Sequence, residues 1–295
     1  VKFPDRLATF VPYCIALVLA VALYPTDALS LSSNRVANEL LQNGPSSFFR
    51  AVRTSDIDYE AYYASARPED NLRLLEMELS SDGARFTQLS AGKLNRFHQA
   101  RGDGRGRLNV VVVVSESFGA EFSKLYGSRK DWTPNFDAYA QQGLWFSNTY
   151  ASGTRTVRGL EAITASFPPI PTVSILHRPG NQDIATWGAV MNSLGYQSSF
   201  LYGGYGYFDD MNSFFSSNGF RVLDRTDIDQ VRFENVWGVA DEDLFDRAIT
   251  DFGEQYAAGK PFFSIIMTTS NHKPFTFRTG LESEGIMATG GGRQS

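Results

Sequence analysis

The sequence predicts an α/β domain, with a mostly parallel sheet flanked by helices. Residues 109–114 read NVVVVV, a β-branched run without polar alternation, which is typical of a central parallel strand buried on both faces. Three further short apolar runs follow, at residues 144–146, 198–202 and 262–268. Segments with helical character lie between or after these runs, around residues 135–142, 184–194 and 241–251. Alternation of strands and helices along a chain predicts a parallel sheet.

The composition is that of a globular protein without a surplus of positive charge. The 295 residues, 42% of them hydrophobic, are enough for one sizeable domain and an additional segment. Because the formal net charge is −5, we do not expect nucleic acid as a partner. The single cysteine, Cys14, cannot form a disulfide within the chain.

The first predicted element is an apolar helix near the amino terminus. Residues 7–24 carry no charge, and the basic residues Lys2 and Arg6 precede them. A run of this length can cross a membrane, although a signal-peptide core or a buried soluble helix would look similar. The basic flank favours an amino end in the cytoplasm, which would place the rest of the chain outside it. We therefore expect residues 1–28 to be a transmembrane segment with its flanks and, because Val1 directly adjoins it, further spans upstream.

A helical linker is expected next, over residues 29–107. Its apolar positions show scattered helical periodicity with many polar residues between them, which indicates connecting helices and not a core. Glycine and charge mix in RGDGRGR at residues 101–107, a pattern typical of a domain boundary. We expect the α/β domain to occupy residues 108–295.

Polar residues that could carry chemistry follow the predicted strands. In parallel sheets, functional groups gather beyond the carboxyl ends of the strands. Glu116 comes shortly after the valine run, where burying a carboxylate is costly unless a divalent cation or an arginine pairs with it. From the residues alone, Glu116 is either a metal ligand or a capping or salt-bridged residue.

A glycine- and hydroxyl-rich turn at residues 151–161 leads from the second apolar run into a helix. Its backbone N–H groups and the charges of Arg155 and Arg158 suit an anionic ligand. Thr154 and Thr156 offer hydroxyls as nucleophiles, although a threonine in this place could also be a helix cap.

One histidine has a setting that suits a phosphate group. His272, preceded by Asn271, follows the last strong strand and has polar neighbours. It could hold a phosphate or a leaving group, or it could be a loop residue with satisfied hydrogen bonds. His98 and His177 lack comparable surroundings, and we expect them to be structural.

Five segments occur in an order that resembles the lipoteichoic acid synthase and phosphoglycerol transferase family, in the sulfatase-like branch of the alkaline phosphatase superfamily. They are SESFG at 115–119, TPNFD at 133–137, the GTRT turn at 153–156, ENVWGVADEDLFD at 234–246 and SNHKPF at 270–275. No segment is specific by itself, but together they lie in order on an α/β pattern over residues 108–275. The resemblance implies a sulfatase-like fold.

The resemblance also implies an activity and a location. The chain resembles phosphoglycerol transferases of the bacterial cytoplasmic (inner) membrane, whose catalytic domain is extracytoplasmic or periplasmic. Such enzymes move glycerophosphate from a phosphatidylglycerol-like lipid to a glycan or polyglycerophosphate acceptor through a covalent threonine intermediate. The aromatic loop at residues 202–208 follows a strand and could line the headgroup or carbohydrate side of the site, or belong to the core or surface.

The resemblance assigns roles to individual residues. Thr156, which opens the predicted helix, takes the place of the nucleophile, with Thr154 as the alternative. Glu116 and Thr156 would bind a divalent cation, for which Mn²⁺ is the expected ion and Mg²⁺ or Zn²⁺ are alternatives. Substrate-binding positions are expected at His272, Asn271, Arg155 and Arg158. Trp237 and Asp241 are expected to shape the fold and not to react.

The chain departs from the family pattern in one respect. Family members bind the metal with a further Asp-His pair on a later strand, and no Asp-His dipeptide occurs in this sequence. We therefore expect a domain truncated at its carboxyl end, which alone could be inactive. The alternatives are a phosphoethanolamine transferase, another sulfatase-fold hydrolase, and a non-catalytic membrane-anchored binding protein of the same fold.

Overall fold

The computed structural model describes most of the α/β domain and separate stretches before it. The described residues are 3–22, 64–80, 84–90, 93–98, 106–168 and 173–280, with single positions at 37, 44, 45, 48 and 170. The chain divides into two compact units, one of residues Val1–Ser80 and Gln88–Asn95 and the other of Ser81–Thr87 and Arg96–Ser295. The expected boundaries after residues 28 and 107 remain predictions.

Helix α1, Phe3–Ala22, is the apolar element expected over residues 7–24. Its window Phe3–Ala20, 18 residues long, is apolar enough to cross a membrane, and none of it is buried. At a rise of about 1.5 Å per residue this window spans about 27 Å, close to the hydrocarbon thickness of a bilayer. The structure is therefore compatible with the predicted membrane helix.

The linker contains both a helix and strands. Helix α5, Pro68–Leu79, begins with a proline and two acidic residues, which favour a helix amino terminus. Strands β1, Ala84–Ser90, and β2, Lys93–His98, form a two-stranded sheet. The Asn95 amide donates a hydrogen bond of 3.3 Å to Gln88 Oε1. The expectation of a helical linker is therefore correct for α5 and wrong for residues 84–90 and 93–98, which form strands.

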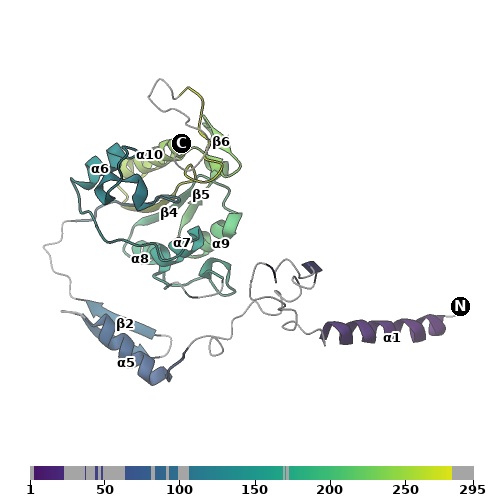
Figure 1. The fold of residues 1–295 in the computed structure, drawn as a ribbon. Helices are drawn as coiled ribbons and strands as arrows, with labels where there is room; N and C mark the ends of the chain where they lie inside the picture. The colour runs from purple at the N-terminus through teal and green to yellow at the C-terminus, as the bar shows by residue number, and fades with distance from the viewer. Residues whose placement is uncertain are drawn as a thin grey trace. The chain divides into compact units, whose positions relative to one another are not determined.

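The second unit is built on a four-stranded parallel sheet with the strand order β3-β8-β4-β5. Figure 1 labels β4 and β5 of this sheet. These strands are β3 (Val110–Val114), β4 (Gln197–Tyr202), β5 (Arg221–Leu223) and β8 (Phe262–Met267). In register, Val110 pairs with Phe263 and Gln197 pairs with Phe262. The last described strand, β8, thus lies between β3 and β4, and the predicted parallel sheet is confirmed.

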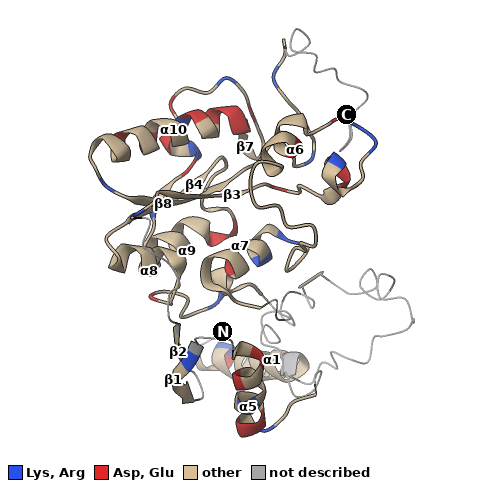
Figure 2. Cartoon of the chain, turned by 90° about the vertical axis from the view of Figure 1, so that its left-hand side faces the viewer, with Lys and Arg blue, Asp and Glu red and all other residues tan. Residues whose placement is uncertain are grey.

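Helices cover both faces of this sheet. The longer ones are α6 (Pro134–Ala140), α7 (Thr156–Ala165), α8 (Trp187–Ser193), α9 (Met211–Ser217) and α10 (Asp241–Ala257). Figure 2 shows α7, α8 and α9 on one face and α10 on the other. The predicted helical segments around 135–142, 184–194 and 241–251 correspond to α6, α8 and α10.

Shorter elements connect these layers. Single turns of 3₁₀ helix lie at η1 (Ala120–Phe122), η2 (Lys124–Tyr126), η3 (Ile175–His177), η4 (Phe208–Asp210) and η5 (Arg225–Asp227). Two-residue strands β6 (Glu234–Asn235) and β7 (Gly238–Val239) pair in antiparallel fashion. They bring the segment before α10 close to the loop after β4, because Val239 N donates to Gly203 O at 2.9 Å.

Side chains of β4 and β8 alternate between two apolar clusters. One cluster, on the side of α7 and α9, includes Leu160, Phe200, Tyr202, Phe214, Phe215, Phe263, Ile265 and Met267. The other cluster, on the side of α10, includes Leu201, Leu244, Ala248 and Ile266. All six residues of β8 are buried, which is typical of a central strand in a parallel sheet.

The valine run does not occupy its predicted place. Among the described residues β3 pairs only with β8, so it lies at an edge of the sheet. Val112 and Val114 pack against the cluster on the α7 side, whereas Val111 and Val113 are 41% and 46% exposed. The prediction of a central strand buried on both faces is wrong, because β-branched composition favours a strand without determining its neighbours.

The apolar run at residues 144–146 does not form a strand. Leu144 and Phe146 are 83% and 64% exposed, and no described strand pairs with the run. The carbonyl of Phe146 instead accepts a hydrogen bond of 2.8 Å from the Tyr126 hydroxyl. The strand prediction is wrong here because a strand requires a neighbour for its backbone hydrogen bonds, and apolar composition does not supply one.

Candidate active site

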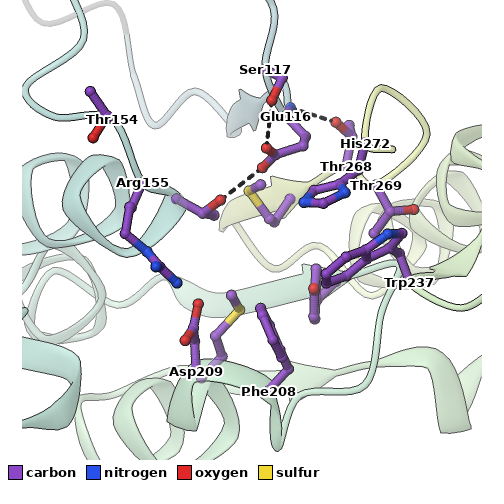
Figure 3. A pocket seen from close by; sticks show the side chains of 14 residues that line it. Glu116, Ser117, Thr154, Arg155, Phe208, Asp209, Trp237, Thr268, Thr269 and His272 are labelled. Atoms are coloured by element: carbon purple, nitrogen blue, oxygen red, sulfur yellow. Dashed lines mark hydrogen bonds between the residues drawn. The ribbon is translucent and has the colours of Figure 1, made fainter. Parts of the chain in front are cut away.

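A cavity of about 360 Å³ opens where β3, β4 and β8 end. It is lined by Glu116, Ser117, Thr154, Arg155, Thr156, Tyr202, Phe208, Asp209, Met211, Trp237, Met267, Thr268, Thr269 and His272 (Figure 3). These residues come from segments far apart in sequence, as expected when the carboxyl ends of parallel strands meet at one edge of a sheet.

Glu116 and Thr156 form the closest polar contact among the predicted site residues. The Thr156 hydroxyl donates a hydrogen bond of 2.8 Å to Glu116 Oε2, and the Ser117 hydroxyl donates one of 2.8 Å to Glu116 Oε1. The backbone N–H of Glu116 donates to Thr268 Oγ1 at 2.9 Å. Both oxygens of the carboxylate are therefore engaged, and the end of β8 holds its backbone in place.

Thr156 is the first residue of α7, as predicted. The residue before it, Arg155, is extended and provides no side-chain cap for the helix. The amino terminus of α7 therefore presents a positive dipole end at the cavity, which favours an anionic group. The side chain of Arg155 lines the cavity and adds a full positive charge there.

A buried carboxylate anchors α7 beneath the cavity. Glu161 is 1% exposed and accepts hydrogen bonds from Ser174 Oγ at 2.8 Å and from Ile175 N at 2.7 Å. Arg158 Nη1 lies 2.8 Å from Glu161 Oε1. Burial raises the pKa of Glu161, but these hydrogen bonds outweigh burial and hold the pKa below its ordinary value.

The two arginines of the turn therefore have different surroundings. Arg155 lines the cavity, whereas Arg158 does not and instead pairs with Glu161. The structure thus brings Arg155 to the site that contains Thr156 and places Arg158 in the support of the helix.

His272 lines the cavity on the side of the loop after β8. Its ring lies against the indole of Trp237 with a centroid distance of 3.8 Å, and its Nδ1 lies 3.0 Å from Lys273 O. Asn271 does not line the cavity, and its amide donates a hydrogen bond of 3.0 Å to Ser117 O. Asn271 therefore ties the loop after β8 to the loop after β3.

Trp237 and Asp241, expected to shape the fold, have different positions. Trp237 lines the cavity, and its indole N–H donates to Lys273 O. Asp241 Oδ1 accepts hydrogen bonds from Thr269 N at 2.8 Å and Ser270 N at 3.0 Å. Burial raises the pKa of Asp241 despite these hydrogen bonds. The structure agrees with a fold-shaping role for Asp241, whereas Trp237 belongs to the cavity wall.

The loop after β4 supplies several lining residues. Tyr202 and Phe208, within the aromatic loop noted in the sequence, both line the cavity. Burial raises the pKa of Tyr202 to about 12, with further contributions from the negative charges of Glu116 and Asp209. The sequence reasoning did not single out Asp209, which follows this loop directly.

The other lining residues that the sequence reasoning missed have a recognisable signal. Thr268 and Thr269 directly follow β8, and Ser117 lies three positions beyond the end of β3, so all belong to strand-end positions. Met211 and Met267 carry no polar group and fill the base of the cavity beside the apolar cluster. Polar residues at strand exits could therefore have been predicted, whereas the methionines could not.

A divalent cation requires more ligands than the described residues offer. Glu116 and Thr156 supply a carboxylate and a hydroxyl, which are oxygen donors that hard cations prefer. Within the described residues, no group of three or more His, Cys, Asp or Glu side chains is arranged to hold a metal ion. These residues alone do not fit a complete metal site.

Comparisons with known sequences agree with the geometry. The family model described as Sulfatase matches residues 108–285. Phosphoglycerol transferase I from Escherichia coli is 27% identical over 188 residues, which cover 58% of this chain and 24% of the relative. Phosphoglycerol transferase I from Citrobacter koseri is 26% identical over 185 residues, with the same two coverages. The chain spans about a quarter of the length of these curated relatives.

Solved structures show the same arrangement of sheet and helices. A protein in the alkaline phosphatase superfamily from Vibrio parahaemolyticus has a TM-score of 0.58 and 36% identity, covering 62% of this chain and 44% of that one. The lipoteichoic acid synthase LtaP from Listeria monocytogenes has a TM-score of 0.52 and 18% identity, covering 58% and 42%. The second likeness concerns the fold alone.

Proposed function

The chain belongs to the sulfatase family and has an alkaline-phosphatase-like fold, and from this premise we propose that it is a phosphoglycerol transferase. In this proposal it moves glycerophosphate from a phosphatidylglycerol-like lipid to a glycan or polyglycerophosphate acceptor. Helix α1 would anchor it in the bacterial cytoplasmic membrane, with the cavity on the extracytoplasmic side. The relatives named phosphoglycerol transferase I support this choice of reaction.

The observation that carries the proposal is the hydrogen bond from Thr156 to Glu116. It joins a hydroxyl at the amino terminus of a ten-residue helix to a carboxylate, 2.8 Å away, inside a cavity. An activated nucleophile requires a group that can accept its proton, and a phosphoryl group requires positive charge around its oxygens. The helix terminus and Arg155 supply that positive charge at the same place.

In the proposed first step, Thr156 Oγ1 attacks the phosphorus of the lipid, and its proton passes to Glu116. The Oγ1–P bond forms while the bond from phosphorus to the diacylglycerol oxygen breaks. His272 is positioned at the cavity wall to give a proton to the leaving oxygen. In the second step a hydroxyl of the acceptor gives its proton to His272 and attacks the same phosphorus, while the P–Oγ1 bond breaks and Thr156 recovers its proton from Glu116.

A bound divalent cation, Mn²⁺ or alternatively Mg²⁺ or Zn²⁺, belongs to the proposal through the resemblance of the motifs. Such an ion would lower the pKa of the threonine hydroxyl and polarise a phosphoryl oxygen. Glu116 and Thr156 are proposed as two of its ligands, and the remaining ligands would have to come from outside the described residues.

The test compares two threonines that line the same cavity. Membranes containing the full chain are given phosphatidylglycerol labelled in its headgroup, and transfer to acceptor and covalent label on the protein are both measured. Changing Thr156 to Ala should abolish both signals, whereas Thr154→Ala should retain both. Undiminished transfer by Thr156→Ala would exclude this nucleophile, and loss of labelling in Thr154→Ala alone would reverse the assignment.

A non-catalytic binding protein is the second candidate, because the described residues lack a complete metal-binding group. It predicts that the chain binds glycerophosphate without forming a covalent adduct, whether or not Mn²⁺ is added. The same labelled assay separates the two: binding without transfer or covalent label supports the second candidate, and covalent label on Thr156 excludes it.

A further inference from the structure

Asp209 places a second carboxylate in the cavity, away from Glu116. It lies in the loop after β4, and Figure 3 shows it on the opposite side of the cavity from Glu116. Its side chain is 17% exposed. The mechanism proposed above uses Glu116 and leaves Asp209 without a role.

The backbone at this point directs the side chain into the cavity. Asp209 and Asp210 have φ values of 52° and 57°, so two consecutive residues with a Cβ adopt the left-handed conformation. Aspartate adopts the left-handed conformation more often than most residues that have a Cβ, but the conformation still costs it free energy. Of the two side chains, Asp209 lines the cavity and Asp210 is exposed to solvent.

Two nitrogen-bearing side chains, His177 and Arg155, lie on the side of the Asp209 carboxylate. His177 Nε2 lies 3.5 Å from Asp209 Oδ1, and Figure 3 shows the side chain of Arg155 extending toward Asp209. A carboxylate has about four acceptor positions, and the His177 contact involves one oxygen. The carboxylate therefore retains acceptor capacity on the side of the cavity.

A carboxylate beside a phosphoryl site repels phosphate, so a role in this reaction must concern another part of the substrate. Two kinds of group suit it: an ammonium ion or hydroxyl groups. Arg155 is always charged and extends toward Asp209 in Figure 3, so its charge opposes a second cation at this carboxylate. Hydroxyl groups are uncharged, so the charge of Arg155 does not repel them. Their hydrogen bonds to an ionised acceptor are also stronger than those to a neutral acceptor.

The aromatic wall is compatible with the same ligand. Phe208, which precedes Asp209 in the chain, meets Trp237 edge to face at 5.7 Å, and Tyr202 also lines the cavity. Aromatic faces could also attract a cation, but the nearby guanidinium of Arg155 counteracts this. A small polyol can place its C–H groups on the rings and its hydroxyls on the carboxylate.

Resting on the proposed function, we propose that Asp209 is a specificity-determining residue that accepts hydrogen bonds from the hydroxyls of the transferred headgroup. The site thereby selects an uncharged, hydroxylated headgroup over one that ends in an ammonium ion. His177 holds the carboxylate from the side away from the substrate. In this chain, the role would favour transfer of phosphoglycerol over transfer of phosphoethanolamine.

The test measures binding of three small phosphates to the full chain in detergent by isothermal titration calorimetry. The probes are glycerol 1-phosphate, propyl phosphate, which has the same chain length without hydroxyls, and ethanolamine phosphate. For the wild-type chain we expect glycerol 1-phosphate to bind about 10- to 100-fold more tightly than propyl phosphate, as hydrogen bonds to a charged acceptor allow. Ethanolamine phosphate should bind no more tightly than propyl phosphate.

The variants make the comparison specific. Asp209→Gly removes the carboxylate without backbone strain, because glycine adopts the left-handed conformation readily. In this variant the affinities for glycerol 1-phosphate and propyl phosphate should be nearly equal. Asp209→Asn keeps an uncharged acceptor and should give an intermediate ratio. Asp210→Gly makes the same backbone change outside the cavity and should keep the wild-type ratio.

Three results would overturn the inference. They are a wild-type chain that binds glycerol 1-phosphate and propyl phosphate equally, an Asp209→Gly variant with the wild-type ratio, and tighter binding of ethanolamine phosphate that depends on Asp209. Transfer activity is not needed for this measurement. If no glycerophosphate is transferred but the ratio depends on Asp209, the proposed reaction fails while the assignment of Asp209 stands.

Discussion

Replacing Glu161 by alanine should destabilise the chain strongly, because this buried carboxylate fastens the helix that begins with Thr156. Glu161 accepts hydrogen bonds from Arg158, Ser174 and Ile175 N, and it is 1% exposed. Removing one partner of a buried ion pair costs about 3 to 5 kcal/mol. We therefore expect Glu161→Ala to lower the free energy of unfolding by about this amount.

The assay is urea unfolding of the full chain in mild detergent, followed by tryptophan fluorescence. Glu161→Gln keeps an acceptor but loses the charge, and we expect it to cost about 1 to 3 kcal/mol. As a control, Glu254→Ala changes an exposed glutamate on α10 and should alter stability by less than about 0.5 kcal/mol. A loss below about 1 kcal/mol for Glu161→Ala would show that α7 is held by other contacts.

The pH dependence of the unfolding free energy, compared between the wild-type chain and Glu161→Gln, gives an independent check. Because the folded state lowers the pKa of Glu161 from its ordinary value of 4.5, the ionised carboxylate stabilises the folded state fully above that value. This contribution is lost as the pH falls through the lowered pKa. The stability difference between the wild-type chain and Glu161→Gln should therefore be constant near neutrality and shrink below about pH 4.5. A difference that grows in acid would contradict the reasoning.

Further predictions concern three other parts of the chain. Asp241→Ala should cost about 2 to 4 kcal/mol of unfolding free energy, because two backbone donors after β8 lose their acceptor, whereas Asp241→Asn retains the acceptor and should cost less. Since burial raises the pKa of Asp241, its protonated form favours folding. Urea unfolding should therefore show the wild-type chain gaining stability relative to Asp241→Asn as the pH falls from neutrality, and no relative gain would refute this. Gly238→Ala should lower the melting temperature, because the new Cβ would lie 2.1 Å from Gly203 O at a backbone φ of 143°; an unchanged melting temperature would mean that the loop can shift. Deleting residues 1–28 should move the chain from the membrane fraction to the soluble fraction after cell lysis, and retention in membranes would place the anchor elsewhere.

The sequence was most informative where one local pattern determined one position. Glu116 near a strand exit and Thr156 at a helix start were both predicted, and the parallel sheet brings them within one hydrogen bond. Both positions depend on local features: a β-branched run before a carboxylate, and a hydroxyl-rich turn before a helix. Their proposed chemical roles depend on the family resemblance and remain proposals.

Positions that depend on distant partners could not be predicted in the same way. The valine run has the composition of a central strand, but its place in the sheet depends on where β8 inserts. Arg155 and Arg158 look equivalent in the turn, yet only Arg158 faces a buried carboxylate one helical turn later. Arg158 and Glu161 are three residues apart, the spacing of a helical ion pair, so their pairing could have been predicted from the sequence.

The strand order of the sheet also determines when β3 can pair during synthesis of the chain. Asn109, before β3, bonds to Phe262 at the start of β8, and 153 positions separate them. At a synthesis rate of about 5 to 20 residues per second, β3 would wait about 8 to 30 s for this neighbour. During that time a run of five valines lacks β8, the strand that pairs with it among the described residues, and such runs are prone to intermolecular pairing. Glu116 lies two residues beyond this strand, so the cavity can assemble only after β8 has emerged.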